Sequence, residues 1–163
     1  RRGPGAGPLV RHLPTAALRP FSQRRPGAGV FDTLKNQRLP QLDKGISAIT
    51  ADLKARGMLD NTVLVWMGEF GRTPKINDNS GRDHWPGSWS AVLGGGGIRG
   101  GQVWGSVSED GMEVRENPVR VPDLMATICR ALGLDPAATN LSSIGRPIPL
   151  ADHGAVAIEQ LLV

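Results

Sequence analysis

The side chains that could do chemistry in this chain gather in one stretch that follows an apolar run. The run, Thr62–Met67, stops at Gly68, and a carboxylate, three cations and an Asp-His pair follow it closely. Loops that leave a buried strand carry binding and catalytic groups more often than the strands themselves. This stretch is therefore the first candidate for a functional site. Its candidate residues are Glu69, Arg72, Lys75, Arg82, Asp83 and His84.

Three of these residues have side chains that bind divalent metal ions. Glu69 could ligate a hard cation or act as a base, and His84 could ligate through a neutral ring nitrogen. Asp83 could ligate directly or orient a ligating histidine. These three do not complete a two-metal site, so His153 is a weaker candidate for a further ligand and His12 is weaker still. The structural alternatives are that Asp83 caps a turn and that His84 is simply packed and hydrogen-bonded.

The three cations point to an anionic ligand. Arg72, Lys75 and Arg82 could hold a phosphate or sulfate ester, because the planar arginine fork matches the oxygens of such groups. The competing interpretation for Arg72 is a local ion pair with Glu69. No Ser-His-Asp triad can be argued and no Gly-x-Ser-x-Gly motif occurs in the sequence, so it identifies no catalytic nucleophile.

The charge of the chain is uneven. The 163 residues contain 19 Lys and Arg against 15 Asp and Glu, but six of the arginines lie in residues 1–29, which leaves 13 basic side chains against 15 acidic ones in the rest. A slightly acidic body does not favour nucleic-acid binding. No apolar run approaches the roughly 20 residues of a membrane helix. The single cysteine, Cys129, excludes an internal disulfide and is expected to be a buried thiol.

Residues 1–29 are rich in Arg, Pro, Gly and Ala, and this composition predicts a disordered basic arm. Two alternatives remain for it: an arm that binds an anionic polymer, or a stretch translated out of frame from GC-rich DNA. Residues 30–163 are expected to form the folded domain, and their number suits a single core.

The predicted elements place the loop between a helix and a pair of strands. Apolar residues at helical spacing from Phe31 to Leu53 predict a helix that Pro40 interrupts and that ends at Gly57. The continuously apolar run Thr62–Met67 predicts a central strand that is covered on both faces.

Further elements are expected after the loop. Ala91–Leu93 predicts a strand, and the four glycines that follow, Gly94–Gly97, permit a close backbone approach or positive φ angles. The Gly-Lys-Ser/Thr ending of a phosphate-binding loop is absent. The remaining expectations are strands at Gln102–Ser106 and Met112–Val114, a helix at Val121–Leu132 with a buried stripe of Leu124, Ile128 and Leu132, and a closing helix at Val156–Leu161.

From Phe31 to its C-terminus the chain resembles the C-terminal part of a bacterial family, domain of unknown function 1501, within the alkaline phosphatase and sulfatase superfamily. Two of the matching stretches, MGEFGRTPKIN and GRDHWP, are long and unusual together. The matching stretches are Leu34–Pro40, Met67–Asn77, Gly81–Pro86, Gly95–Gly101 and Gly145–Pro147.

The resemblance implies an α/β fold, namely the C-terminal part of an alkaline phosphatase/sulfatase-like α/β sandwich with a central mixed sheet. It also implies a metal-dependent hydrolase that acts on a phosphate or sulfate ester with zinc, calcium or magnesium. Glu69 and His84 fall where the superfamily has metal ligands, whereas Phe70 stands where it has a ligating histidine. The implied site is therefore reduced or altered. A non-catalytic anion- or metal-binding module with the same fold is the alternative.

The chain departs from the family before Phe31. Full-length relatives are expected to be exported and to extend further upstream, where a first metal-binding carboxylate and the nucleophile region lie. Where they have a Trp-Asp-Thr-His-like motif, this chain has Arg24–Gly29. We therefore expect a truncated or frame-shifted reading near residue 30 and little activity from the isolated chain. We also expect an exposed sheet edge with marginal stability.

Overall fold

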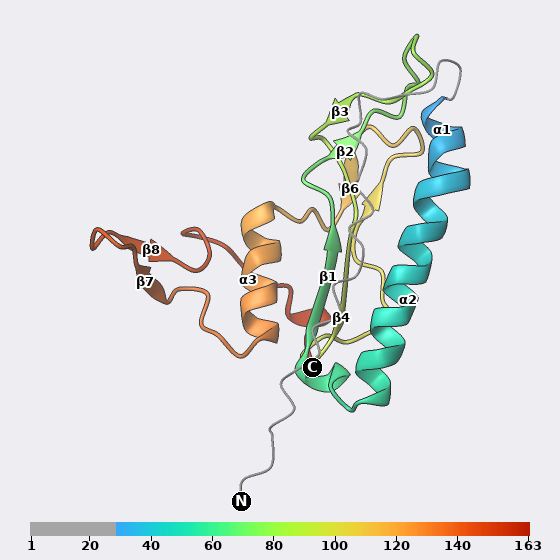
Figure 1. The fold of residues 1–163 in the computed structure, drawn as a ribbon. Helices are drawn as coiled ribbons and strands as arrows, with labels where there is room; N and C mark the ends of the chain where they lie inside the picture. The colour runs from blue at the N-terminus through green and yellow to red at the C-terminus, as the bar shows by residue number, and fades with distance from the viewer. Residues whose placement is uncertain (1–28) are drawn as a thin grey trace, which may run out of the picture.

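A computed structural model describes residues 29–163, so the arm predicted over residues 1–29 lies outside the described residues apart from Gly29. The described chain is a mixed α/β structure in which a long helix and a shorter helix flank a two-stranded ribbon (Figure 1). The predicted α/β class is confirmed. A central mixed sheet is not seen within residues 29–163, where the strands form four separate antiparallel pairs.

The first helical segment has the interruption that Pro40 predicts. It consists of α1 (Val30–Thr33), a π-helical stretch (Leu34–Arg38) and α2 (Leu39–Ala55). Proline has no N–H to donate to the carbonyl four residues earlier, and the helix widens immediately before it. The predicted stop is also confirmed, because Gly57 follows α2 with a φ of 66°.

The ribbon at the centre of the molecule joins β1 (Val63–Met67) to β4 (Ala91–Gly95) in antiparallel register, with Val65 opposite Leu93. Both strands were predicted. The expectation of a central strand is wrong for residues 29–163, where β4 is its only partner strand. Although helices flank the ribbon, the C-terminal half of β1 is not covered, since Trp66 is 44% exposed. An apolar sequence indicates that a strand prefers a buried environment, but it does not show which strands or helices pack against it.

The glycine turn Gly94–Gly97 packs the ribbon closely against the rest of the chain. At Gly97, where φ is 74°, an added Cβ would lie 2.3 Å from the carbonyl oxygen of Ala131 at the end of helix α3 (Val121–Ala131). The predicted close backbone approach is therefore confirmed. Gly95, Gly96 and Gly97 serve close packing between elements, whereas a Cβ at Gly94 would meet nothing within 4 Å.

Helix α3 (Val121–Ala131) carries much of the described core. Of the stripe predicted for it, Leu124 is buried and Ile128 is half-buried, but Leu132 is 53% exposed because the helix has already ended there. The expected burial of Cys129 is confirmed. The buried residues of the helix are Asp123, Leu124, Ala126, Thr127 and Cys129.

Residues 154–163, which we call the C-terminal strap, fasten α3 to the ribbon. The backbone N–H of Val156 donates to Asp123 Oδ1 at 2.9 Å, and that of Ile158 donates to Thr127 Oγ1 at 3.0 Å. On its other side the strap meets the chain just after β4, through the bridge between Ile98 and Leu162 and the 2.8 Å bond from Arg99 N to Leu161 O.

The closing helix predicted at Val156–Leu161 is wrong over most of its length. Only a single 3-10 turn forms, at Glu159–Leu161. Val156 and Ile158 are instead held against α3 by the bonds that their N–H groups donate to its side chains, and Ile158 has a non-helical ψ of 87°.

Two short hairpins lie after β4 along the chain. One pairs β5 (Ser106–Val107) with β6 (Val114–Glu116), a few residues later along the chain than predicted. The other pairs β7 (Thr139–Leu141) with β8 (Pro147–Pro149) and projects from the α3 side of the molecule, away from α2 (Figure 1). This second hairpin was not predicted, because two prolines in three residues argue against a strand.

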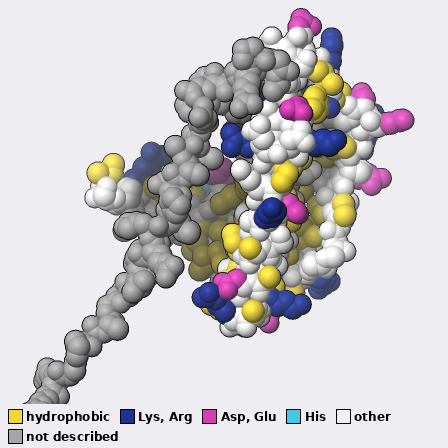
Figure 2. All heavy atoms as spheres, turned by 45° about the vertical axis from the view of Figure 1, so that its right-hand side comes forward, with side chains coloured by type: hydrophobic (Ala, Val, Ile, Leu, Met, Phe, Trp, Pro, Cys, Tyr) yellow, Lys and Arg dark blue, Asp and Glu magenta, His cyan; other side chains and the backbone are white. Residues whose placement is uncertain are grey.

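The described surface carries both signs of charge. On the face shown in Figure 2, basic and acidic side chains are interspersed over α2 and the segments beside it, as expected for a slightly acidic body. Among residues 29–163, no helix is both long enough and apolar enough to cross a membrane.

Candidate functional site

The predicted functional loop is closed by a short pair of strands. β2 (Gly71–Arg72) pairs antiparallel with β3 (His84–Trp85), so that Arg72 lies opposite His84 in the register. We call residues 69–88 the site loop. Its closure brings two of the six predicted site residues together, although they are separated by eleven intervening positions in the sequence.

A phenylalanine lies against both of these residues. The ring centroid of Phe70 is 4.2 Å from that of His84, and the two planes are tilted by 43°. The guanidinium carbon of Arg72 is 5.8 Å from the same Phe70 centroid. A cation near an aromatic face is attracted by the ring quadrupole, so Phe70 helps to hold Arg72 and His84 as one group. The resemblance drew attention to Phe70 only as a missing histidine.

Gly71 lets the two strands approach. A Cβ at this buried glycine would lie 2.0 Å from the carbonyl oxygen of Ser88 and 3.0 Å from that of Trp85. A side chain here would push β2 and β3 apart and separate Arg72 from His84. Sequence reasoning missed this role. A contact between residues seventeen positions apart leaves no local signal in the chain.

Asp83 is engaged by the loop itself. Its Oδ1 accepts a hydrogen bond from Asn77 Nδ2 at 2.8 Å. Its backbone N–H donates to Thr73 Oγ1 at 3.1 Å, and its carbonyl accepts from the Thr73 N–H at 3.0 Å. The structural alternative for Asp83, a residue that fixes a turn, therefore describes the contacts observed among the described residues.

Arg82 is also engaged by the protein. Its Nη1 donates to the carbonyl of Thr73 at 2.7 Å and to the carbonyl of Pro74. The guanidinium carbon lies 5.5 Å from the ring centroid of Phe31 at the start of α1. Lys75, by contrast, is exposed. Of the three predicted anion-binding cations, Arg72 and Lys75 are therefore better placed to meet a ligand than Arg82.

The three predicted metal ligands do not form a cluster in the described part of the chain. No group of three His, Cys, Asp or Glu side chains there could hold a metal ion. Asp83 and His84 are neighbours on an extended segment, where successive side chains point to opposite faces. Glu69 is exposed at the bend between β1 and β2, and His153 is exposed beyond β8. As a set, the residues present do not fit a metal ion.

Two carboxyls elsewhere in the described chain have lowered pKa values. Hydrogen bonds from the Arg120 guanidinium hold the pKa of Asp123 at about 2, well below its usual value. Hydrogen bonds from the Ser108 hydroxyl and the Met112 N–H lower the pKa of Asp110 in the turn between β5 and β6. Both carboxyls bind groups of their own chain, so their perturbation is explained structurally and marks no catalytic acid or base.

The fold and the loop together define a small mixed α/β domain that presents a cationic, aromatic-backed loop beyond one end of its ribbon. The chain belongs to the family described as a protein of unknown function, DUF1501, which matches residues 29–162. The family predicted from the sequence stretches is thereby confirmed. No curated protein and no solved structure matches the chain.

Proposed function

We propose that the site loop binds the anionic group of a phosphate or sulfate ester. The observation that carries this proposal is the placement of Arg72 opposite His84, with Phe70 against both. Guanidinium and imidazole N–H groups are donors suited to phosphate and sulfate oxygens. Lys75, exposed on the same loop, adds a third donor and a charge.

A wider proposal concerns hydrolysis. The resemblance supports the C-terminal part of an alkaline phosphatase/sulfatase-like α/β sandwich, in which an exported, metal-dependent enzyme cleaves the ester. The six predicted site residues include no Ser, Thr or Cys nucleophile, and no three His, Cys, Asp or Glu side chains within residues 29–163 could hold a metal ion. On this proposal those groups come from other polypeptide, and the 163-residue chain alone binds the anion without turning it over.

A second candidate is a non-catalytic anion-binding module with the same fold. The contact between the Phe70 and His84 rings favours it, since an aromatic ring takes up space next to the imidazole that a metal and its other ligands would need. The two candidates agree on the anion and differ only in whether other protein completes a hydrolytic site.

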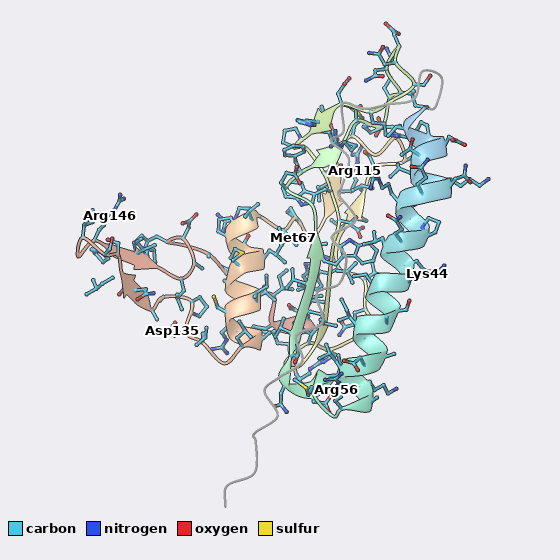
Figure 3. All side chains as sticks on the ribbon, in the orientation of Figure 1. Lys44, Arg56, Met67, Arg115, Asp135 and Arg146 are labelled. Carbon is cyan, nitrogen blue, oxygen red and sulfur yellow. The ribbon has the colours of Figure 1, made fainter. Side chains whose placement is uncertain are left out.

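The test is a calorimetric titration of inorganic phosphate and inorganic sulfate into the full chain. We expect saturable binding that weakens at least about tenfold in Arg72→Met, since a charged donor pair is lost. Arg146→Met is the matched control, because Arg146 lies at the tip of the β7–β8 hairpin, far from the site loop (Figure 3). Equal affinity in both variants, or no binding at all by the wild type, would overturn the proposal. Rapid turnover of an aryl phosphate or aryl sulfate would contradict the claim that the chain alone is inactive.

A further inference from the structure

The segment between β2 and β3 is held in shape by three polar side chains, Asn77, Arg82 and Asp83, which we call the loop clamp. We propose that the loop clamp positions the proposed anion site, and that Asp83 acts through Asn77 and does not itself contact a ligand or metal ion. This inference rests on the proposed function of the site loop and assigns two of its predicted ligands, Arg82 and Asp83, a different role.

Asn77 uses both ends of its amide. Its Oδ1 accepts the backbone N–H groups of Asn79 and Gly81, each at 3.0 Å, and its Nδ2 donates to Asp83 Oδ1 at 2.8 Å. An Asn side chain that bonds its own backbone two residues on stabilises a tight turn. The third bond ties that turn to Asp83, which directly precedes β3.

Arg82 joins the same segment to the first helix. Its bonds to the Thr73 and Pro74 carbonyls connect the end of the segment to the residues that follow β2. The ring of Phe31 lies against the same guanidinium. The Val30 N–H donates to the Ser80 carbonyl at 3.4 Å. The start of α1 is thus seated on the loop.

The loop clamp lies directly beside Arg72 and His84, the proposed anion-binding pair. Thr73 and Asp83, which exchange two hydrogen bonds, directly adjoin Arg72 and His84 in the β2–β3 pairing. Because a two-residue strand pair has little stability of its own, contacts just beyond it decide whether the pair stays formed. Loosening the loop clamp should therefore let Arg72 and His84 separate without altering either of them.

Asn77→Ala tests the positioning role without changing the charge of the loop. We expect faster amide hydrogen exchange at Thr73 and Gly81, and phosphate affinity roughly tenfold lower, because three hydrogen bonds are lost and one of them is to a carboxylate. Asn79→Ala is the matched control, since Asn79 belongs to the same turn but, among residues 29–163, contributes only its backbone N–H to the loop clamp. It should leave both quantities unchanged.

The exchanged pair Asn77→Asp with Asp83→Asn separates positioning from direct contact. It keeps one amide and one carboxylate in the same hydrogen bond but moves the carboxylate away from position 83. We expect it to restore both slow exchange and phosphate affinity to within about twofold of the wild type. Restored exchange with affinity still lost would overturn the proposal, because the Asp83 carboxylate would then be needed by the ligand.

Arg82→Met and Lys75→Met provide a second comparison, in which one positive charge is removed in each case. We expect only Arg82→Met to accelerate exchange at Thr73, and unchanged exchange in that variant would overturn the role of Arg82. If wild-type chain binds neither phosphate nor sulfate, the proposed function fails and with it the positioning of an anion site. The exchange rates then still report separately whether the loop clamp exists.

Discussion

Two exposed pieces of β-structure in this molecule are protected against association to very different degrees. β8 contains Pro147 and Pro149, which have no N–H to offer to another strand. β1 is five apolar residues without a charge or a proline, and within residues 29–163 only β4 pairs with it. Natural proteins guard edges that remain in solvent, so the comparison indicates that β8 is made for exposure and that β1 is not.

The same contrast extends to the glycines of the two regions. Gly97 beside the ribbon and Gly145 in the turn of the β7–β8 hairpin have nearly the same φ, 74° and 76°. A Cβ at Gly97 would collide with the end of α3, whereas a Cβ at Gly145 would meet nothing within 4 Å. The ribbon is thus packed on the α3 side even though its β1 edge is open among the described residues.

The largest expected effect comes from exchanging these glycines for alanine. Gly97→Ala should lower the free energy of unfolding by about 3 kcal/mol or more, since left-handed strain and overpacking add together. Gly145→Ala has the strain alone and should cost about 1 kcal/mol. Urea unfolding of both variants measures the difference. Equal losses would show that the ribbon is no better packed than the hairpin.

A smaller effect is expected from the carboxylate that anchors the C-terminal strap to α3. The pKa of Asp123 is about 2 in the folded chain against an ordinary 3.8, so its contribution to stability is complete above about pH 4 and disappears as the pH falls toward 2. The contribution is roughly 1–2 kcal/mol after allowance for the exposure of Arg120. Wild-type stability should fall over this range more steeply than that of Asp123→Asn. Parallel pH profiles would contradict this assignment.

Lysine substitutions on β1 and β8 should change the stability of the folded state least, but they test the comparison of the two strand edges most directly. Val65→Lys should increase the soluble fraction of concentrated protein several-fold, because a charge on an open apolar strand opposes edge pairing. Ile148→Lys on β8 should change it little, although Ile148 is 50% exposed and Val65 only 41%. Sedimentation after concentration measures both. A larger gain from Ile148→Lys would reverse the comparison.

The elements that sequence reasoning predicted well are those whose signal is local. The helical spacing and end signals of α3, the apolar run of β1 and the break at Pro40 all lie within a few residues of the structure they specify. The family and the α/β class followed from the same local stretches.

What could not be predicted depends on contacts between distant positions. The strap is held to α3 by bonds from the Val156 and Ile158 N–H groups to Asp123 and Thr127, which lie 33 and 31 positions away in the sequence. The shape of the site loop depends on the close approach of Gly71 to Ser88 and of Arg82 to the ring of Phe31. Asp83 and His84 were grouped as metal ligands from their residue types, and a two-residue strand gives no periodic pattern from which their divergent directions could be predicted.

The most direct test of the central claim is an NMR titration of the isotopically labelled full chain with inorganic phosphate and sulfate, observing the Arg72 Nε and the His84 ring nitrogens. If the site loop binds the anion, both sets of signals shift together along one saturable curve, and the Arg146 Nε signal does not follow them. If the Arg72 and His84 signals stay fixed, or follow only the non-saturating change of Arg146, the site loop is not an anion site.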